Sequence, residues 1–182
     1  MNRSLYELRK STIQIGKIYF WTATIRNWHN LLGDDDFKEV ITGSLDHLSK
    51  NGLIDVFGLV IMPNHIHLIW RLNNMNGKEL PSASFTKYAA HQFKKMLPPN
   101  ELIKYYVDAA NKTYEFWQRD SLATDLYTPS VAYQKLDYIH LNPMGHKWNL
   151  VTDPSDYEFS SASFYEKGNT PFSFLKHLGE EF

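Results

Sequence analysis

The segment IMPNHIHLIW, residues 61–70, places His65 and His67 one residue apart in an aliphatic run. On a β-strand, side chains two positions apart point to the same face, so the two imidazoles would project together while Ile66 and Leu68 face the other side. Two neutral imidazoles side by side can supply half of a divalent-metal site. The alternation equally fits two half-buried histidines on the polar face of a sheet, and this segment alone leaves both interpretations open.

Spacing excludes two familiar histidine arrangements. The His-x-His-x-His pattern of histidine-triad nucleotide hydrolases would require a third histidine where this chain has Ile69. The HExxH helix of many zinc hydrolases is absent from the sequence. A third ligand must therefore come from another part of the chain.

The segment LDYIHLNP, residues 136–143, contains a tyrosine and an asparagine four residues apart. On a helix, Tyr138 and Asn142 share a face about one turn apart, whereas His140 points elsewhere. Two imidazoles and one amide oxygen would leave open positions on a cation, which could then act as a Lewis acid on a phosphate. Tyr138 would attack the polarised phosphorus and form a phosphotyrosine. The alternative is that Tyr138 and Asn142 only pack and cap the end of the helix.

The hydropathy pattern indicates the elements that must position these residues. Strands are expected over residues 16–28, 54–72 (two strands, broken at Met62-Pro63-Asn64) and 112–119, and helices over 34–52, 82–97 and 130–143. The second and third helices are expected to begin at serines, and the third to end near Asn142, because the residue before a proline disfavours helical geometry. This order predicts an α+β domain, an antiparallel sheet with helices on one face.

Composition bounds the class of protein. The chain has 182 residues, 43% of them hydrophobic, which favours a single globular domain over residues 1–182. No apolar run is long enough to span a bilayer, the N-terminus MNRSLYELRKSTIQIG lacks the apolar core of a signal peptide, and a cytoplasmic location is expected. There are no cysteines, which excludes disulfides, thiolate metal sites and cysteine nucleophiles.

The net charge of -1 hides an uneven distribution. Residues 1–26 carry five basic side chains against one acidic, including Arg3, Arg9 and Lys10, and residues 85–119 carry six against three. Residues 151–182 carry six acidic side chains against two basic. The basic sections fit either nucleic-acid binding or ordinary solvated surface.

VIMPNHIHLIW and LDYIHLNP, in this order, resemble the motifs of single-tyrosine HUH transposases of the insertion-sequence 200/605 type, and above all of REP-associated tyrosine transposases. FWQRD at residues 116–120 is similar to the family's WQR motif. YEFSSASFY at 157–165 is similar to its W-x-x-SS-x-x-x-Y element, with Tyr157 where tryptophan is usual. The resemblance covers roughly residues 15–165. The single domain over residues 1–182 is expected to have a core of about 15–150 and a C-terminal extension over 151–182.

The resemblance implies a ferredoxin-like antiparallel sheet flanked by helices, the HUH endonuclease fold. It implies cleavage of single-stranded DNA beside a hairpin, through a 5′-phosphotyrosine and with Mg²⁺ or Mn²⁺. By position, His65 and His67 are metal ligands, Asn142 is the third ligand and Tyr138 is the nucleophile. Family members are commonly more basic than this chain, and both a homodimer and a monomer agree with the sequence.

Other contacts with DNA follow from charge and aromaticity. Lys87, Lys94, Lys95 and Arg119 are candidates for phosphate contacts. Trp21, Tyr88 and Trp117 could stack on bases or belong to the core. Two other functions stay open: a non-cleaving protein that binds DNA or RNA hairpins, and a metal-dependent phosphoesterase that uses water.

Overall fold

The computed structural model describes residues 13–119, 121–169 and 171–182. The expectations about a signal peptide and about Arg3, Arg9 and Lys10 therefore lie outside the described residues, as does Asp120 of the FWQRD segment.

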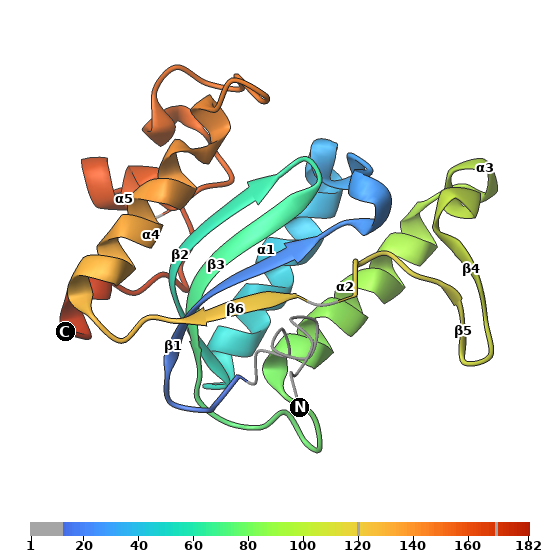
Figure 1. Ribbon diagram of the computed structural model, residues 1–182, viewed down its shortest axis with the longest axis horizontal. Helices are drawn as coiled ribbons and strands as arrows, with labels where there is room; N and C mark the ends of the chain where they lie inside the picture. Colours follow the sequence, from blue (N-terminus) through green and yellow to red (C-terminus); the bar gives the residue numbers. More distant parts are fainter. Residues whose placement is uncertain (1–12, 120, 170) are drawn as a thin grey trace, which may run out of the picture.

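Four antiparallel strands form the central sheet, in the order β2-β3-β1-β6 (Figure 1). Their bounds are β1 Ile18–Thr24, β2 Ile54–Met62, β3 His65–Leu72 and β6 Leu122–Asp125. Helix α1, Asp35–Lys50, connects β1 to β2, and helix α2, Pro81–Met96, follows β3. This β-α-β-β-α-β order is the ferredoxin-like arrangement, so the expected α+β fold class is confirmed.

The remaining elements lie around this unit. They are α3 Pro99–Leu102, β4 Tyr106–Ala109, β5 Lys112–Tyr114, α4 Pro129–Leu141 and α5 Ala162–Lys167. Short 3₁₀ turns follow β1 and α4. Helix α4 ends at Leu141, close to the expected Asn142, but Asn142 itself keeps helical angles and a 3₁₀ turn continues over Asn142–Met144, so the proline does not end the helical geometry.

The predicted strand over residues 112–119 is only partly correct. Within it, β5 pairs with β4 in a separate hairpin, and Trp117 forms one isolated antiparallel bridge to Ile25 just after β1. The aromatic residues that suggested a sheet strand pack on α2 instead, where Phe116 is buried against Phe93 and the Trp117 indole donates to Thr86 O at 2.9 Å. The true fourth strand, β6, lies at the edge of the sheet and is exposed on alternate residues, so it has little hydrophobic signal.

The expected helices on one face are a second correction, because both faces of the sheet are covered. Helices α1 and α2 pack on one face, where Trp21, Leu68 and Trp70 lie. Helix α4 packs on the other, against Phe20 and Ile69 (Figure 1). Every residue of β2 is buried, which leaves neither of its faces free for solvent.

The expected serine caps are also wrong. Helix α2 begins at Pro81 after Leu80, and α4 begins at Pro129 after Thr128, whose hydroxyl accepts a hydrogen bond from the Val131 amide at 3.3 Å. Proline is favoured at the first helical position because its missing N–H has no partner there in any case.

The segment over residues 157–165 closes the outer edge of β2. The hydroxyls of Tyr157 and Tyr165 donate to Ile61 O at 2.8 Å and to Phe57 O at 2.6 Å. Between them, the Ser161 amide donates to Leu59 O at 2.9 Å, and the Ser161 hydroxyl accepts from the Leu59 amide at 3.0 Å. The serines and tyrosines of YEFSSASFY therefore satisfy an edge strand that would otherwise have free backbone groups.

Part of the acidic C-terminal section balances charge on the sheet. Arg71 on β3 pairs with Asp55 on β2 and with Glu181, and Lys176 also pairs with Asp55. Burial raises the pKa of Asp55, but the hydrogen bonds from Lys176 and Arg71 outweigh it and hold that pKa below its usual range. Glu181 thus ties the end of the chain to the sheet.

Gly58 controls how closely α4 approaches β2. A Cβ at this position would lie 2.8 Å from Leu136 Cδ1 and 3.0 Å from Ile139 Cδ1, at a bulge in β2. We expect Gly58→Val to lower the free energy of unfolding by about 1–3 kcal/mol through overpacking, as measured by urea denaturation. Gly43→Ala is the matched control, because Gly43 is exposed within α1 with nothing near its missing Cβ, and this change should stabilise the protein slightly. Equal stability of the two variants would contradict this account.

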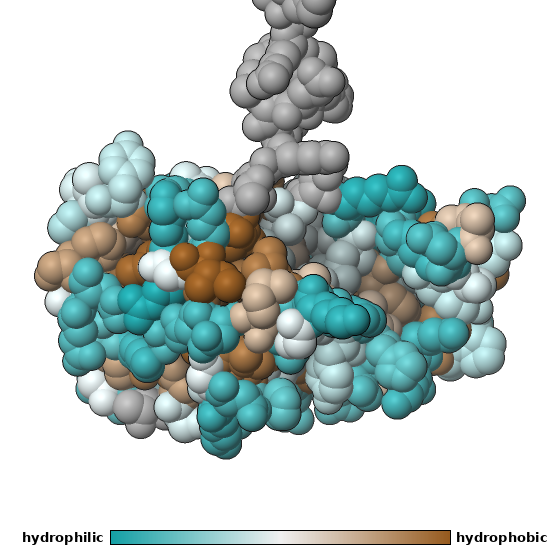
Figure 2. Space-filling view, turned by 90° about the horizontal axis from the view of Figure 1, so that it is seen from below, coloured by the Kyte–Doolittle hydropathy of each residue, from teal (hydrophilic) through white to brown (hydrophobic). Residues whose placement is uncertain are grey.

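The surface seen from below is mainly hydrophilic, with hydrophobic residues gathered near the middle of the face (Figure 2). Across the described ranges, no helix combines the length and the apolarity that crossing a membrane requires.

Candidate active site

His65 and His67 lie on β3, one of the two central strands, and face α4. Their ring centroids are 4.7 Å apart. His67 stacks on Phe20 of the neighbouring strand β1, with ring centroids 5.2 Å apart. Both side chains are less than a tenth exposed. The strand geometry therefore brings the two imidazoles together as the alternation predicts.

One nitrogen of each imidazole is fixed by a neighbour. His65 Nδ1 lies 2.7 Å from Asn64 Oδ1, and His67 Nδ1 lies 2.7 Å from Thr22 Oγ1, on the residue that pairs with His67 in the β1–β3 ladder. His67 Nε2 is buried and has no hydrogen-bond partner among the described residues. A buried nitrogen without a partner is costly. With the His67 proton on Nδ1 and directed at Thr22 Oγ1, the Nε2 lone pair is left for a ligand that the protein itself does not supply.

Burial makes both histidines neutral at pH 7. It lowers the pKa of His65 to about 4, with a further contribution from the positive charge of Lys147. It lowers the pKa of His67 to about 3, helped by His65 and Lys135. Neutral imidazoles have a free lone pair, which is the form that binds metals.

Tyr138 reaches this pair from α4. Its ring centroid lies 5.5 Å from that of His67 and 6.0 Å from that of Phe20. The side chain of Tyr138 is 50% exposed, so the phenol borders both the histidines and solvent. Lys135, one turn earlier, places its Nζ 4.9 Å from the Phe20 ring and 5.6 Å from the Tyr138 ring. Packing of α4 on the sheet thus brings a phenol and a cation to the histidines.

Asn142 follows Tyr138 by about one turn and continues the helical backbone at φ -56°, half buried. His140 is used otherwise. It is buried, and its Nε2 lies 2.8 Å from Ser161 Oγ, in the segment that closes β2. His140 therefore fastens α4 to the C-terminal segment, on a different face from Tyr138.

The described residues contain no cluster of three histidine, cysteine, aspartate or glutamate side chains that could hold a metal ion. A cation bound to His65 and His67 would therefore need a ligand of another type, and an amide oxygen such as that of Asn142 is of the right chemistry.

Two tryptophans that the sequence reasoning missed lie beside His65. The ring centroids of Trp28 and Trp148 are 6.4 Å and 6.1 Å from that of His65. Lys147 places its Nζ 5.6 Å from the Trp28 ring and 5.1 Å from the Trp148 ring. Trp28 is 55% exposed and has a left-handed backbone, with φ +57°, which is rare for a bulky residue and frequent at functional sites.

Asn64 links the left-handed turn at Trp28 to the histidine pair. Its side-chain amide donates a hydrogen bond to Trp28 O at 3.2 Å, and its side-chain oxygen lies within hydrogen-bond distance of His65 Nδ1. Asn64 is itself buried. Asn64 could have been suspected from its place in the PNH sequence, and Lys135 from its spacing to Tyr138, but Thr22, Trp28 and Trp148 depend on the fold.

The predicted phosphate contacts lie elsewhere. Lys87, Lys94 and Lys95 are on α2, which covers the face of the sheet opposite to α4, and Arg119 follows the β4–β5 hairpin. The structure does not bring these four residues to the histidines. Lys135 and Lys147 are instead the basic residues next to them.

The predicted stacking residues also differ in exposure. Trp21 is 1% exposed and belongs to the core, and Trp117 is half buried against α2. Tyr88 is 50% exposed. Of these three, only Tyr88 presents a large free surface.

No model of a known protein family matches the chain, and no curated protein matches it. Solved structures do. A REP-associated tyrosine transposase bound to a REP hairpin aligns with a TM-score of 0.60 at 18% identity, over 98% of this chain and 99% of that chain. A candidate transposase from Deinococcus radiodurans aligns with a TM-score of 0.42 at 15% identity, over 76% of this chain and 95% of that one. The chain therefore has the fold of the REP-associated tyrosine transposase, over nearly its whole length, as the resemblance in its motifs predicts.

Proposed function

We propose that this protein is a transposase-like endonuclease and strand transferase that cuts single-stranded DNA and keeps the 5′ end on Tyr138. The observation that carries the proposal is that the ring centroids of Tyr138 and His67 lie 5.5 Å apart, although the two residues are far apart in the sequence. A nucleophile beside two neutral imidazoles is the pairing that phosphoryl transfer with a bound cation needs. The fold shared with a REP-associated tyrosine transposase supports the same activity.

A divalent cation, Mg²⁺ or Mn²⁺, would be held by His65, His67 and Asn142. The donors fit such an ion, because the two imidazoles are neutral and His67 Nε2 is buried without a partner among the described residues. When bound, the cation would polarise the scissile phosphate and stabilise negative charge on its oxygens.

Tyr138 is half exposed, so a DNA strand can reach its phenol oxygen. In the proposed reaction this oxygen attacks phosphorus, the bond from phosphorus to the 3′ oxygen breaks, and a 5′-phosphotyrosine remains. The phenolic proton passes to water, and the departing 3′ oxygen takes a proton from water. Attack by a 3′ hydroxyl on the phosphotyrosine reverses these steps and joins strands, which makes the reaction a recombination.

Lys135 and Lys147 bring positive charge to the two sides of the histidine pair, and they can contact the phosphates that flank the scissile one. Trp28 and Trp148 offer ring faces on which unpaired bases can stack. Single-stranded DNA suits this combination better than duplex DNA, whose bases are already stacked on each other.

A hairpin beside the cleaved strand is the substrate we propose, because the structural neighbour is bound to a REP hairpin. The test is to incubate the protein with a labelled hairpin that carries single-stranded flanks, with Mg²⁺ or Mn²⁺, and to look for a covalent protein–DNA adduct. Binding without any cleavage would favour a hairpin-binding protein, and cleavage without an adduct would favour a phosphoesterase that uses water.

Asn64 positions the ligand His65 in this proposal. With the proton of His65 on Nδ1 and directed at Asn64 Oδ1, the Nε2 lone pair is left for the cation. We expect Asn64→Ala to weaken Mn²⁺ binding by about 10- to 100-fold, measured by calorimetric titration. Asn74→Ala is the matched control, since Asn74 is exposed and bonds to Gly52 O. Unchanged Mn²⁺ affinity in Asn64→Ala would refute this role.

A further inference from the structure

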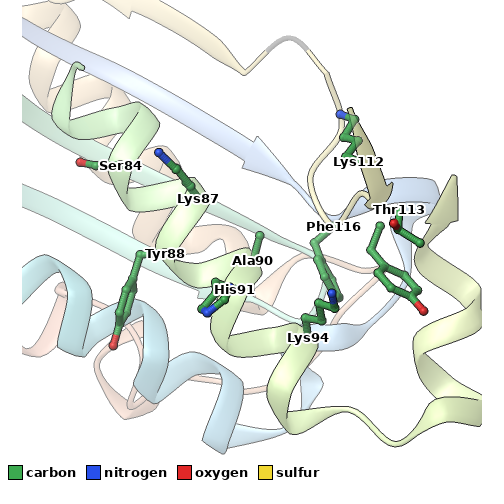
Figure 3. Close-up of a pocket in the computed structure, with 10 residues that line it drawn as sticks. Ser84, Lys87, Tyr88, Ala90, His91, Lys94, Lys112, Thr113 and Phe116 are labelled. Carbon is green, nitrogen blue, oxygen red and sulfur yellow. The ribbon is translucent and has the colours of Figure 1, made fainter. Parts of the chain in front are cut away.

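A hollow of about 500 Å³ lies between α2 and strand β5 (Figure 3). Both elements lie on the side of the molecule away from α4 (Figure 1). Lys87, His91 and Lys94 line it from the helix, and Lys112 faces them from β5. A second hollow of about 420 Å³ shares Lys87 and Lys112 and extends to Arg119. The two form one groove along α2.

We propose that this α2–β5 groove is a second nucleic-acid site, which binds single-stranded DNA at a distance from Tyr138. The proposal concerns binding alone and does not depend on cleavage.

The groove has more positive than negative charge. Lys87 is 76% exposed and lies 3.5 Å from Glu79, in an ion pair between two exposed side chains. Lys94 has no carboxylate partner among the described residues, and its Nζ lies 5.2 Å from the Tyr114 ring. Such lightly compensated side chains can exchange their present contacts for a phosphate at little cost.

One buried carboxylate organises the far wall. Glu115 is 6% exposed and pairs with three cations, Arg26, Lys112 and Arg119. Burial raises the pKa of Glu115, but the hydrogen bonds from Lys112 and Arg119 outweigh it and keep that pKa below its usual range. A single negative charge shared by three positive ones leaves a net positive charge around Glu115.

Aromatic residues line the groove together with the basic ones. Tyr88 on α2 is 50% exposed, and Tyr114 on β5 lines the opposite wall. Phe116 is buried and underlies the groove. A basic groove that carries aromatic side chains is the arrangement that binds single strands, because the lysines follow the backbone while bases stack on the rings.

The spacing along α2 fits an extended strand. Lys87 and Lys94 are two helical turns apart, which is about 10 Å along the helix axis, and both line the groove. An acidic peptide could meet the charges but has no bases for the rings, and a duplex hides its bases. We therefore assign the groove to single-stranded DNA.

The groove and the histidine pair lie on opposite sides of the sheet, since α2 covers one face and α4 the other. A strand held along α2 would thus be bound away from the scissile phosphate. Such a site would retain a flank of the substrate through cleavage and rejoining.

The test is fluorescence anisotropy with a labelled hairpin that carries a single-stranded tail, in EDTA so that no cleavage occurs. We expect the double variant Lys87→Gln/Lys94→Gln to bind about tenfold more weakly and to lower the slope of log affinity against log salt by about 1.4. Tyr88→Ala should weaken binding at least about fivefold with an unchanged salt slope.

The matched control is Lys50→Gln/Lys167→Gln, which makes the same charge change on exposed residues outside the groove and should leave the affinity unchanged. Equal affinity of the groove variant and the control would overturn the proposal while leaving Tyr138 chemistry intact. Equal sensitivity of a blunt duplex to the lysine changes, or full displacement of the DNA by a glutamate-rich peptide, would also overturn it. Binding in the groove without any adduct would remove the proposed activity and keep the second site.

Discussion

Tyr138→Phe is expected to abolish the covalent protein–DNA adduct, reducing its yield to background. The substitution removes one oxygen, and that oxygen is the atom that would bond to phosphorus. The ring remains, so its packing against Phe20 and His67 is kept and the fold should be undisturbed. The adduct is measured as labelled DNA that migrates with the protein on a denaturing gel.

The matched control is Tyr133→Phe, on the same helix and 39% exposed. Its adduct yield should equal that of the unmodified protein. Cleavage that persists in Tyr138→Phe would show that water is the nucleophile, and the proposed role of Tyr138 would then be wrong. An adduct that persists would mean that another residue attacks.

His67→Gln is expected to lower the affinity for Mn²⁺ by at least about 100-fold and to eliminate cleavage. His67 supplies one of the two imidazoles, and its Nε2 is the buried nitrogen that has no partner among the described residues. Removing one ligand of three takes away a large part of the binding free energy. Glutamine is used because it retains most of the volume beside Phe20, whereas alanine would leave a cavity.

The binding is measured without reference to activity, by calorimetric titration and by the rise in melting temperature that Mn²⁺ causes. His47→Gln is the control, since His47 is exposed on α1. We expect Mn²⁺ to raise the melting temperature of this control and of the unmodified protein but not that of His67→Gln. An equal rise in all three proteins would refute His67 as a ligand.

Local pattern was sufficient for most of the elements. The helical spacing over residues 34–52 and the Pro63-Asn64 turn each led to an element that the structure contains. These signals succeed because they depend on neighbours along the chain. Strand β6 was not predicted, because an edge strand with exposed alternate residues needs no hydrophobic pattern.

The faces of the sheet were harder to predict. The near-continuous apolar run of β2 indicates a strand buried on both sides, yet it does not say which helix covers which face. That choice depends on how the total apolar surface is shared between α1, α2 and α4. The close approach of α4 to β2 also requires that residue 58 has no side chain, which only glycine provides.

The candidate site divides in the same way. The two-residue period of a strand is sufficient to predict that His65 and His67 share a face, and the helical period is sufficient for Tyr138 and Asn142. The meeting of Tyr138 with His67, the bonds of Thr22 and Asn64 to the imidazoles, and the position of Lys87 and Lys94 on the far side of the sheet all depend on the fold. The physical reason is that strand register and helix docking are set by burial summed over the whole chain, which no short segment contains.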